Sequence, residues 1–410
     1  MLVIFSKGGL LIMISTKGPL QNYRIIDFTD RHGVLGTRIL AGLGAEVIRI
    51  EPPGGDPMRQ YGPLSEDGGD SFFWLQMNAV KKSVVLDLES ESGRNSFWSL
   101  LESSDALIES GFRNNLELHG FSWVNLSARC PKLVYTTTSP FGCEGPRSQW
   151  AGGDLVAMAA GGLMYLCGDQ DRAPLRVSVE QASAQVSVQA MVGTLIALRA
   201  RKKGASGQRV DVSMQEAITN TLGNSQVTYA LTKVISKRAG GGRASAEGGA
   251  RLVWPCADGY VAFSRSPRAI PLIHQWMIDE GVEPKFSPEP IPELTGAGSV
   301  PRPELNPTVA KLVQEIDQEI ESFFKRFSKM ELYEEGQKRG TMMCPVSTIA
   351  NLFENKQLVD REFFIDVEHS ESDRTYTYPG APFRMSKSIW KSGPLAPTVG
   401  QHSEEILGSL

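Results

Sequence analysis

The stretch from residue 24 to residue 50 constrains the fold more than any other part of the sequence. An apolar run at 24–28 is typical of a short buried strand, a helical pattern follows and stops at Gly44, and a second apolar run covers 45–50. A strand, a helix and a strand within roughly 30 residues predict two parallel strands joined by a right-handed crossover. The first turn has no GxGxxG motif, which argues against the usual kind of dinucleotide site.

The same pattern continues further along the chain. Strands are predicted at 83–88, 106–109 and 133–138, with a helix over 92–103. Two loops rich in proline and glycine, 51–59 and 139–146, each follow a predicted strand. The carboxyl ends of parallel strands are where open α/β sheets bind ligands. The sequence therefore predicts a doubly wound, Rossmann-like α/β domain with its ligand loops along one edge.

The composition narrows the functional classes. A chain of 410 residues exceeds one ordinary core, so a second domain is expected. A net charge of −4 gives no reason to expect a nucleic acid partner. The five cysteines and five histidines are scattered, with no CxxC, HxH or HExxH motif. We therefore expect no disulfide framework, no metal site and a cytoplasmic location. No segment reaches the roughly 20 apolar residues of a membrane span.

Residues 1–19 are an exception to this globular pattern. Two short apolar runs there look superficially like a secretion signal, but no basic residue precedes them and Lys7-Gly8-Gly9 separates them. We interpret 1–19 as a disordered extension, or as translation from an upstream start codon with Met13 as the true start.

Short motifs spread along the chain indicate a family. From about residue 20 onward they resemble, in order, the motifs of the family III CoA-transferases, also called the CaiB/BaiF or formyl-CoA transferase family. The segments that carry the resemblance are 51–59, 78–83, 139–146, 152–163, 207–214, 257–261, 345–348, 380–386 and 400–407. They cover nearly the whole chain, which makes the resemblance highly specific.

The resemblance implies a particular architecture. Family members combine a large α/β domain, built from both ends of the chain, with a smaller α/β domain, and two protomers interlock like linked rings. The plan assigns 20–200 to the large domain, 201–225 to a linker, 226–330 to the small domain, and 331–410 to a second linker and the return to the large domain. A homodimer, or a heteromer with a homologous chain, is therefore expected.

The resemblance also implies the ligand. In the family, coenzyme A or its acyl thioester is a substrate rather than a permanently bound cofactor. Carried over by motif, the candidate CoA contacts are His32, Gly33, Arg59, Lys81, Lys82, Phe112 and Arg113. Cationic side chains and free backbone N–H groups suit a ligand with three phosphates. For each lysine or arginine, the alternative is a surface charge that contacts no ligand.

The catalytic position departs from the family pattern. Family members use one aspartate, which attacks an acyl-CoA and forms an anhydride that CoA thiolate or an acceptor acid reopens. That aspartate ends a pattern similar to R-V-G-V-P-I-A-D, and residues 176–183 align with it without a gap. Gly193 and the segment 207–209 keep the register, so Ser183 stands in the aspartate's place. A serine cannot form the anhydride, and no histidine lies near it in the sequence to activate it.

Glu180 is the carboxylate near this position, about one helical turn before Ser183. It is a candidate substitute nucleophile, and the alternative is an acidic residue that only stabilises a helix N-terminus. The racemase branch of the family uses a histidine that would fall at Gly153, so that activity lacks its base here. Asp154 is expected to cap the helix that follows it.

One branch of the family accounts for a missing aspartate. Benzylsuccinate CoA-transferase consists of two homologous subunits, of which only one carries the aspartate. The other resembles this chain in a V-x-Q-A run, here residues 179–182. The first hypothesis is an aspartate-lacking subunit of a heteromeric CoA-transferase for a dicarboxylic or aryl-succinate type acid. The alternatives are a self-sufficient transferase that uses Glu180 and a non-catalytic CoA-binding scaffold.

Overall fold

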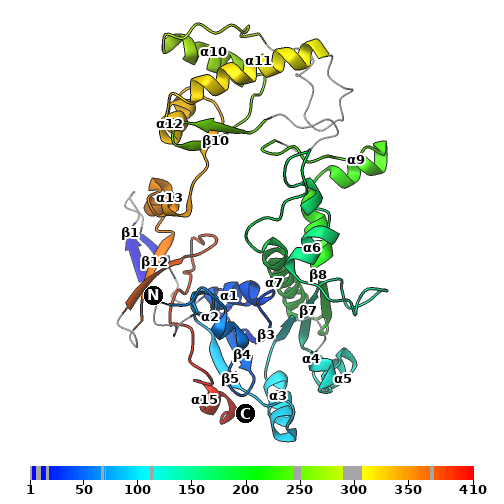
Figure 1. The fold of residues 1–410 in the computed structure, drawn as a ribbon. Helices are drawn as coiled ribbons and strands as arrows, with labels where there is room; N and C mark the ends of the chain where they lie inside the picture. Colours follow the sequence, from blue (N-terminus) through cyan, green and yellow to red (C-terminus); the bar gives the residue numbers. More distant parts are fainter. Residues whose placement is uncertain are drawn as a thin grey trace. The chain divides into compact units, whose positions relative to one another are not determined.

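The structure is a computed structural model, and it describes residues 2–5, 11–14, 18–65, 69, 71–110, 115–242, 251–289, 307–369 and 374–410. The chain forms two compact units (Figure 1). The first consists of Met1–Gly161, Ser178–Asn220 and Asn355–Leu410, and the second of Gly162–Val177 and Thr221–Glu354. The predicted architecture, a large domain formed by both chain ends and a smaller second domain, is confirmed.

The first unit contains most of the helices and strands. Its strands are β1 (Leu2–Phe5), β2 (Leu11–Ile14), β3 (Arg24–Phe28), β4 (Glu46–Glu51), β5 (Lys82–Val85), β6 (Ala106–Ser110), β7 (Val134–Ser139), β8 (Arg209–Ser213), β12 (Phe364–His369) and β13 (Arg374–Pro379). Its helices are α1 (Val34–Gly42), α2 (Phe72–Asn78), α3 (Glu91–Glu102), α4 (Asn115–Leu118), α5 (Trp123–Arg129), α6 (Asp154–Ala160), α7 (Gln181–Lys202), α8 (Met214–Thr219), α14 (Lys356–Asp360) and α15 (Ser403–Leu407).

This unit is built around a six-stranded sheet with the order β5-β4-β3-β6-β7-β8 (Figure 1). Every neighbouring pair of strands in it is parallel. Counted from β3, the strand order is the 3-2-1-4-5-6 of a doubly wound nucleotide-binding fold. The direction of winding therefore reverses between β3 and β6, and the predicted Rossmann-like domain is confirmed without the glycine motif.

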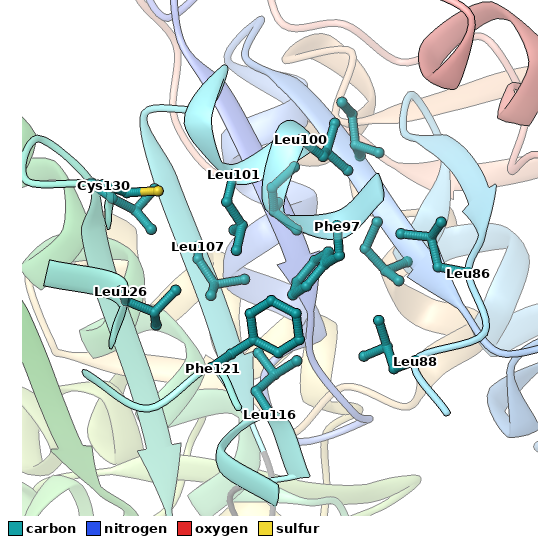
Figure 2. Packing of buried hydrophobic residues seen from close by; sticks show 14 of the residues in the cluster. Leu86, Leu88, Phe97, Leu100, Leu101, Leu107, Leu116, Phe121, Leu126 and Cys130 are labelled. Atoms are coloured by element: carbon teal, nitrogen blue, oxygen red, sulfur yellow. The ribbon is translucent and has the colours of Figure 1, made fainter. Parts of the chain in front are cut away.

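Helices cover both faces of the sheet because successive residues of a strand point to opposite sides. In β3, Ile25 packs in a core cluster with α1 and α7, whereas Ile26 packs with α3, α5 and α15. Figure 2 shows the second cluster, in which Phe97 of α3 lies beside Phe121. Each fully buried side chain of this kind contributes about 1.5 to 3 kcal/mol. Ile406 of α15 joins the same cluster, which holds the C-terminal end of the chain on this sheet.

A buried cluster of charges lies in this sheet. The carboxylate of Asp27 in β3 accepts hydrogen bonds from Thr37 of α1 at 2.8 Å, from Arg49 of β4 at 2.9 Å and from Lys81 at 2.8 Å. Burial by itself raises the pKa of Asp27, but the charges of Lys81 and Arg49 outweigh it and hold that pKa well below its usual value. Burial lowers the pKa of Lys81 to about 8, although Asp27 opposes the shift. Both groups are therefore charged at neutral pH.

The second unit has its own core. It contains β9 (Val253–Cys256), β10 (Gly259–Phe263), β11 (Met343–Pro345), α9 (Ser225–Thr232), α10 (Ala269–Asp279), α11 (Pro307–Phe324), α12 (Lys329–Lys338) and α13 (Ile349–Phe353). The three strands form an antiparallel sheet with β10 in the middle. Aromatic side chains dominate the core, including the fully buried Trp254 and Trp276. None of the helices in the described parts of either unit is long and apolar enough to cross a membrane.

Several predicted boundaries differ from the structure. Residues 201–225, expected to be a linker, contain β8 and α8, because β8 completes the sheet beside β7. Residues 162–177 belong to the second unit, and the return to the first begins at Asn355, since α12 and β11 are part of the second unit. In the predicted disordered extension, the described parts form β1 and β2, which pair as an antiparallel hairpin.

Replacing Lys81 tests the buried charge cluster. Lys81→Met removes one partner of a buried ion pair, so we expect the free energy of unfolding to fall by about 3 to 5 kcal/mol. The neighbouring Lys82, 30% exposed, bridges two glutamates at the surface, and Lys82→Met should cost less than about 1 kcal/mol. Urea unfolding of the two variants measures the difference, and equal losses would contradict the structural role of Lys81.

Candidate active site

A cavity of about 60 Å³ lies at the carboxyl edge of the six-stranded sheet. Its lining comes from the ends of β6 and β7 and from segments next to β3, β8 and α6: Asp30, His32, Ser110, Thr138, Ser139, Pro140, Gly152 and Met214. The winding reverses between β3 and β6, and doubly wound folds bind their ligands at this place. The topology of the sheet thus locates the candidate site without help from any sequence motif.

Asp30 and Ser110 join the ends of the two central strands. The backbone N–H of Asp30 donates to the Oγ of Ser110 at 2.6 Å, and the Ser110 hydroxyl donates to the Oδ1 of Asp30 at 2.6 Å. The same carboxylate oxygen accepts the backbone N–H of His32 at 2.8 Å. These bonds hold the turn that carries His32 against the end of β6.

Helices α1 and α7 meet beside this turn. The Oγ of Ser187 in α7 accepts the backbone N–H of Gly36 at 2.7 Å and donates to the carbonyl oxygen of Gly33 at 2.6 Å. The approach is so close that a Cβ on Gly36 would lie 2.4 Å from the carbonyl oxygen of Ser187. Ser183 precedes Ser187 by about one helical turn. The contact between the two helices therefore brings Ser183 to the turn that carries His32.

Asp154 stabilises the start of α7 from outside that helix. Its Oδ1 accepts the backbone N–H groups of Ala182 at 2.7 Å and of Ser183 at 3.2 Å. A carboxylate at this place satisfies N–H groups that have no partner within the helix and interacts favourably with the helix dipole. The prediction that Asp154 caps the helix following it is wrong, because α6 begins at Asp154 itself and has Gly153 as its N-cap.

Ser183 takes part in a ring of polar contacts with three other side chains. Its Oγ lies 2.7 Å from the Nδ1 of His32 and donates to the Oε2 of Glu180 at 3.0 Å. Arg31 closes the ring: its Nη1 lies 3.6 Å from the Oε1 of Glu180, and its Nε donates to the Nε2 of His32 at 3.4 Å. The sequence places no histidine near Ser183, but the fold brings His32 into contact with it from 151 positions away.

Glu180 is the N-cap residue of α7, yet its side chain makes no capping hydrogen bond. The carboxylate, 27% exposed, contacts Ser183, His32 and Arg31 instead. Asp154 already supplies the acidic group at this helix N-terminus. The contacts of Glu180 therefore favour a role in the site over a role that only stabilises the helix.

The predicted CoA contacts are distributed over several places. His32 lines the cavity, and Gly33 follows it as the N-cap of α1. Gly33 is buried, and a Cβ there would lie 2.8 Å from the Oγ of Ser110, so tight packing requires a glycine at this position. Phe112 and Arg113 lie outside the described residues.

Lys81 is not placed as predicted. Its ammonium group is buried and donates to Asp27, Thr37 and Asn78 at 2.8, 2.9 and 3.1 Å. An ammonium group has three protons, and these three acceptors use all of them. Lys81 is therefore neither a phosphate contact nor a surface charge in this structure. The physical reason is that the buried carboxylate of Asp27 is stable only with a positive charge beside it.

Arg59 and Lys82 are both paired with carboxylates. Arg59 donates to the two oxygens of Glu51 at 2.7 and 2.8 Å, and its guanidinium group lies 3.9 Å from the centroid of the Trp74 ring. The side chains of Arg59 and Lys82 are 18% and 30% exposed, respectively. Both keep some surface that a ligand can reach.

Sequence reasoning missed Arg31, Asp30 and Ser110 as members of the site. The available signal was a run of charged residues, Asp30 to His32, in the turn directly after the first strand of the sheet. Loops placed at such an edge often carry function. Ser110 has no comparable signal, because it is one of many serines in the chain. In the part of the chain that the structure describes, no group of three His, Cys, Asp or Glu side chains is placed to hold a metal ion.

The fold of this chain is that of a solved protein structure. A CaiB/BaiF family protein from Brucella suis has a crystal structure that superimposes on this chain with a TM-score of 0.80. The match covers 96% of this chain and 99% of that chain, at 23% sequence identity. At this identity the likeness shows the fold, a large doubly wound domain with a smaller α/β domain.

The family model of CoA-transferase family III matches residues 20–403, so the chain belongs to this family. A subunit of succinyl-CoA:(R)-benzylsuccinate CoA-transferase from Thauera aromatica is 35% identical over 396 residues, which cover 94% of this chain and 93% of the relative. A succinyl-CoA:mesaconate CoA-transferase from Haloarcula hispanica is 27% identical over 405 residues, 95% of this chain and 96% of the relative. The family predicted from the short motifs is confirmed.

Removing the Asp154 carboxylate should loosen the start of α7. Asp154→Ala takes an acceptor from two backbone N–H groups, and losing a helix cap costs about 0.5 to 2 kcal/mol of unfolding free energy. Asp154→Asn keeps an oxygen at the same place and should lose less. Chemical unfolding of both variants measures the difference, and an alanine variant as stable as the original chain would contradict the capping role.

Proposed function

We propose that this chain is the aspartate-lacking subunit of a heteromeric CoA-transferase, which moves CoA from an acyl-CoA thioester to a carboxylic acid. The observation that carries the proposal is Ser183, which aligns with the family's catalytic aspartate and is only 5% exposed. An anhydride intermediate requires a carboxylate nucleophile. The nucleophile of the reaction therefore comes from an aspartate-bearing homologue that assembles with this chain.

The relatives support the substrate class. One is a subunit of an enzyme named for (R)-benzylsuccinate, and another is an enzyme named for mesaconate. Both are dicarboxylic acids, and the first also carries an aromatic ring. We infer that the acceptor of the complex is a dicarboxylic or aryl-succinate type acid.

The binding of CoA and the assembly are part of the same proposal. We assign contacts with CoA to six of the motif residues and leave out Lys81, whose charge is used inside the sheet. The six are His32, Gly33, Arg59, Lys82, Phe112 and Arg113. Two chains, either identical or homologous, interlock in the manner of the family.

Co-expression with an aspartate-bearing homologue tests the proposed function. The purified complex should transfer CoA from succinyl-CoA to at least one acid of a dicarboxylate and aryl-succinate panel, whereas this chain alone should not. The matched control is a complex in which the homologue's aspartate is changed to alanine, and it should be inactive. Transfer by this chain alone would sink the proposal. A chain that binds CoA in calorimetry but forms no active complex would instead be a CoA-binding scaffold.

Glu180 supports a second candidate function, a self-sufficient transferase with this glutamate as nucleophile. The observation that favours it is that the carboxylate contacts Ser183 and Arg31 rather than capping its helix. Under this alternative, hydroxylamine added during turnover of the chain alone modifies Glu180, and Glu180→Gln abolishes CoA transfer. Mass mapping of the protein detects the adduct, and an unmodified Glu180 in a chain that is turning over excludes the alternative.

A further inference from the structure

The hydrogen bonds around Ser183 determine which nitrogen of His32 carries a proton. An ionised carboxylate only accepts hydrogen bonds, so the proton between Ser183 and Glu180 belongs to the serine hydroxyl. With its own proton used in this way, the Oγ of Ser183 can only accept from the Nδ1 of His32, 2.7 Å away. His32 therefore carries a proton on Nδ1, and in the neutral imidazole the lone pair is then on Nε2.

A second contact points to the same tautomer. The Nε of Arg31 donates to the Nε2 of His32, and a guanidinium group has no acceptor atom. Because the distance is 3.4 Å and the Arg31 side chain is 40% exposed, this bond is weak enough for another donor to replace it. The contact with Ser183 thus fixes the proton on Nδ1, and the contact with Arg31 is made to the lone pair of Nε2.

The ring of His32 lies beside space that a small molecule can occupy. A Cβ on Gly153 would lie 3.8 Å from both Cε1 and Nε2 of His32, so this glycine leaves space at the edge of the ring that carries the lone pair. His32 also lines the cavity of about 60 Å³, together with Ser110, Thr138 and Ser139. A polar cavity whose volume, measured in the same way, is about 10 to 15 Å³ is large enough to hold one water molecule. The site therefore has room and hydrogen-bonding partners for water beside a base.

We propose that this site hydrolyses acyl-CoA thioesters slowly, with His32 as the general base. The Nε2 of His32 takes a proton from water, and the water oxygen forms a bond to the thioester carbonyl carbon. The bond between this carbon and sulfur breaks, and the CoA thiolate takes the proton from His32. The products are a free carboxylic acid and CoA. Ser183 and Glu180 are positioning residues, because they act only through the tautomer of His32.

The inference rests on the proposed function in one respect, the binding of an acyl-CoA thioester next to this cavity. It adds a reaction that needs no acceptor acid and no aspartate. General acid–base catalysis contributes about 10² to 10⁴-fold to a rate. The activity of the chain by itself should therefore be measurable, and it should depend on a histidine rather than on a carboxylate nucleophile.

Release of free thiol from succinyl-CoA by the full chain, without any acceptor acid, tests the proposal. His32→Gln removes the basic nitrogen, so it should lower the rate of hydrolysis at saturating thioester about 10²-fold. The control is His119→Gln, since His119 pairs with Glu89 and is not part of the cavity lining. Equal hydrolysis by the two variants, or none by the original chain, overturns the proposal.

Isotope-labelled water and trapping with hydroxylamine distinguish direct attack by water from attack by Ser183 or Glu180. In ¹⁸O water, a single turnover should place one label in the released acid and none in the protein, and hydroxylamine should trap no adduct. An acyl group on Ser183 or an adduct on Glu180 overturns direct attack by water.

The variant Ser183→Ala tests the positioning role of Ser183. It removes the acceptor for the Nδ1–H of His32 and should lower the rate of hydrolysis less than His32→Gln does. If the complex transfers CoA but the chain alone hydrolyses no thioester, only the proposed hydrolysis is wrong. If the chain hydrolyses the thioester but no complex transfers CoA, only the proposed CoA-transferase function is wrong.

Discussion

The buried carboxylate of Asp27 is the interaction on which the rest of the large domain depends. One oxygen accepts from Thr29 and Arg49, and the other from Thr37 and Lys81, so a single side chain connects β3, α1, β4 and the segment before β5. A buried charge without partners would be very unfavourable, so these contacts must form together. They set the direction in which the chain leaves β3, and the turn from Asp30 to Gly33 follows at once.

That turn and the start of α7 make the site, and each is held by contacts distant in sequence. Ser110 holds Asp30, Ser187 holds Gly33 and Gly36, and Asp154 holds the first N–H groups of α7. The place of Ser183 at the start of α7 is thus fixed by contacts from segments distant in the sequence.

The two neighbouring lysines show how far sequence reasoning reached. Both belong to one motif that predicts the same role for them, yet Lys81 is buried in an ion pair and Lys82 lies at the surface. Successive residues of an extended chain point to opposite sides, and only the position of Asp27 decides which side needs a cation. The turn at the start of α7 shows the same limit: the motif pattern points to Ser183, but its partner His32 comes from a strand end 151 positions away in the chain.

The sequence by itself determined the family and the doubly wound domain, because these depend on local patterns and on the order of motifs. It also predicts a ligand site at the carboxyl edge of the sheet. Only the tertiary structure decided that Lys81 neutralises Asp27, that Asp154 caps α7 rather than α6, and that Arg31, His32 and Glu180 surround Ser183. These contacts join segments far apart in the chain, and their partners are selected by burial and by the crossing of α1 and α7, which no local pattern encodes.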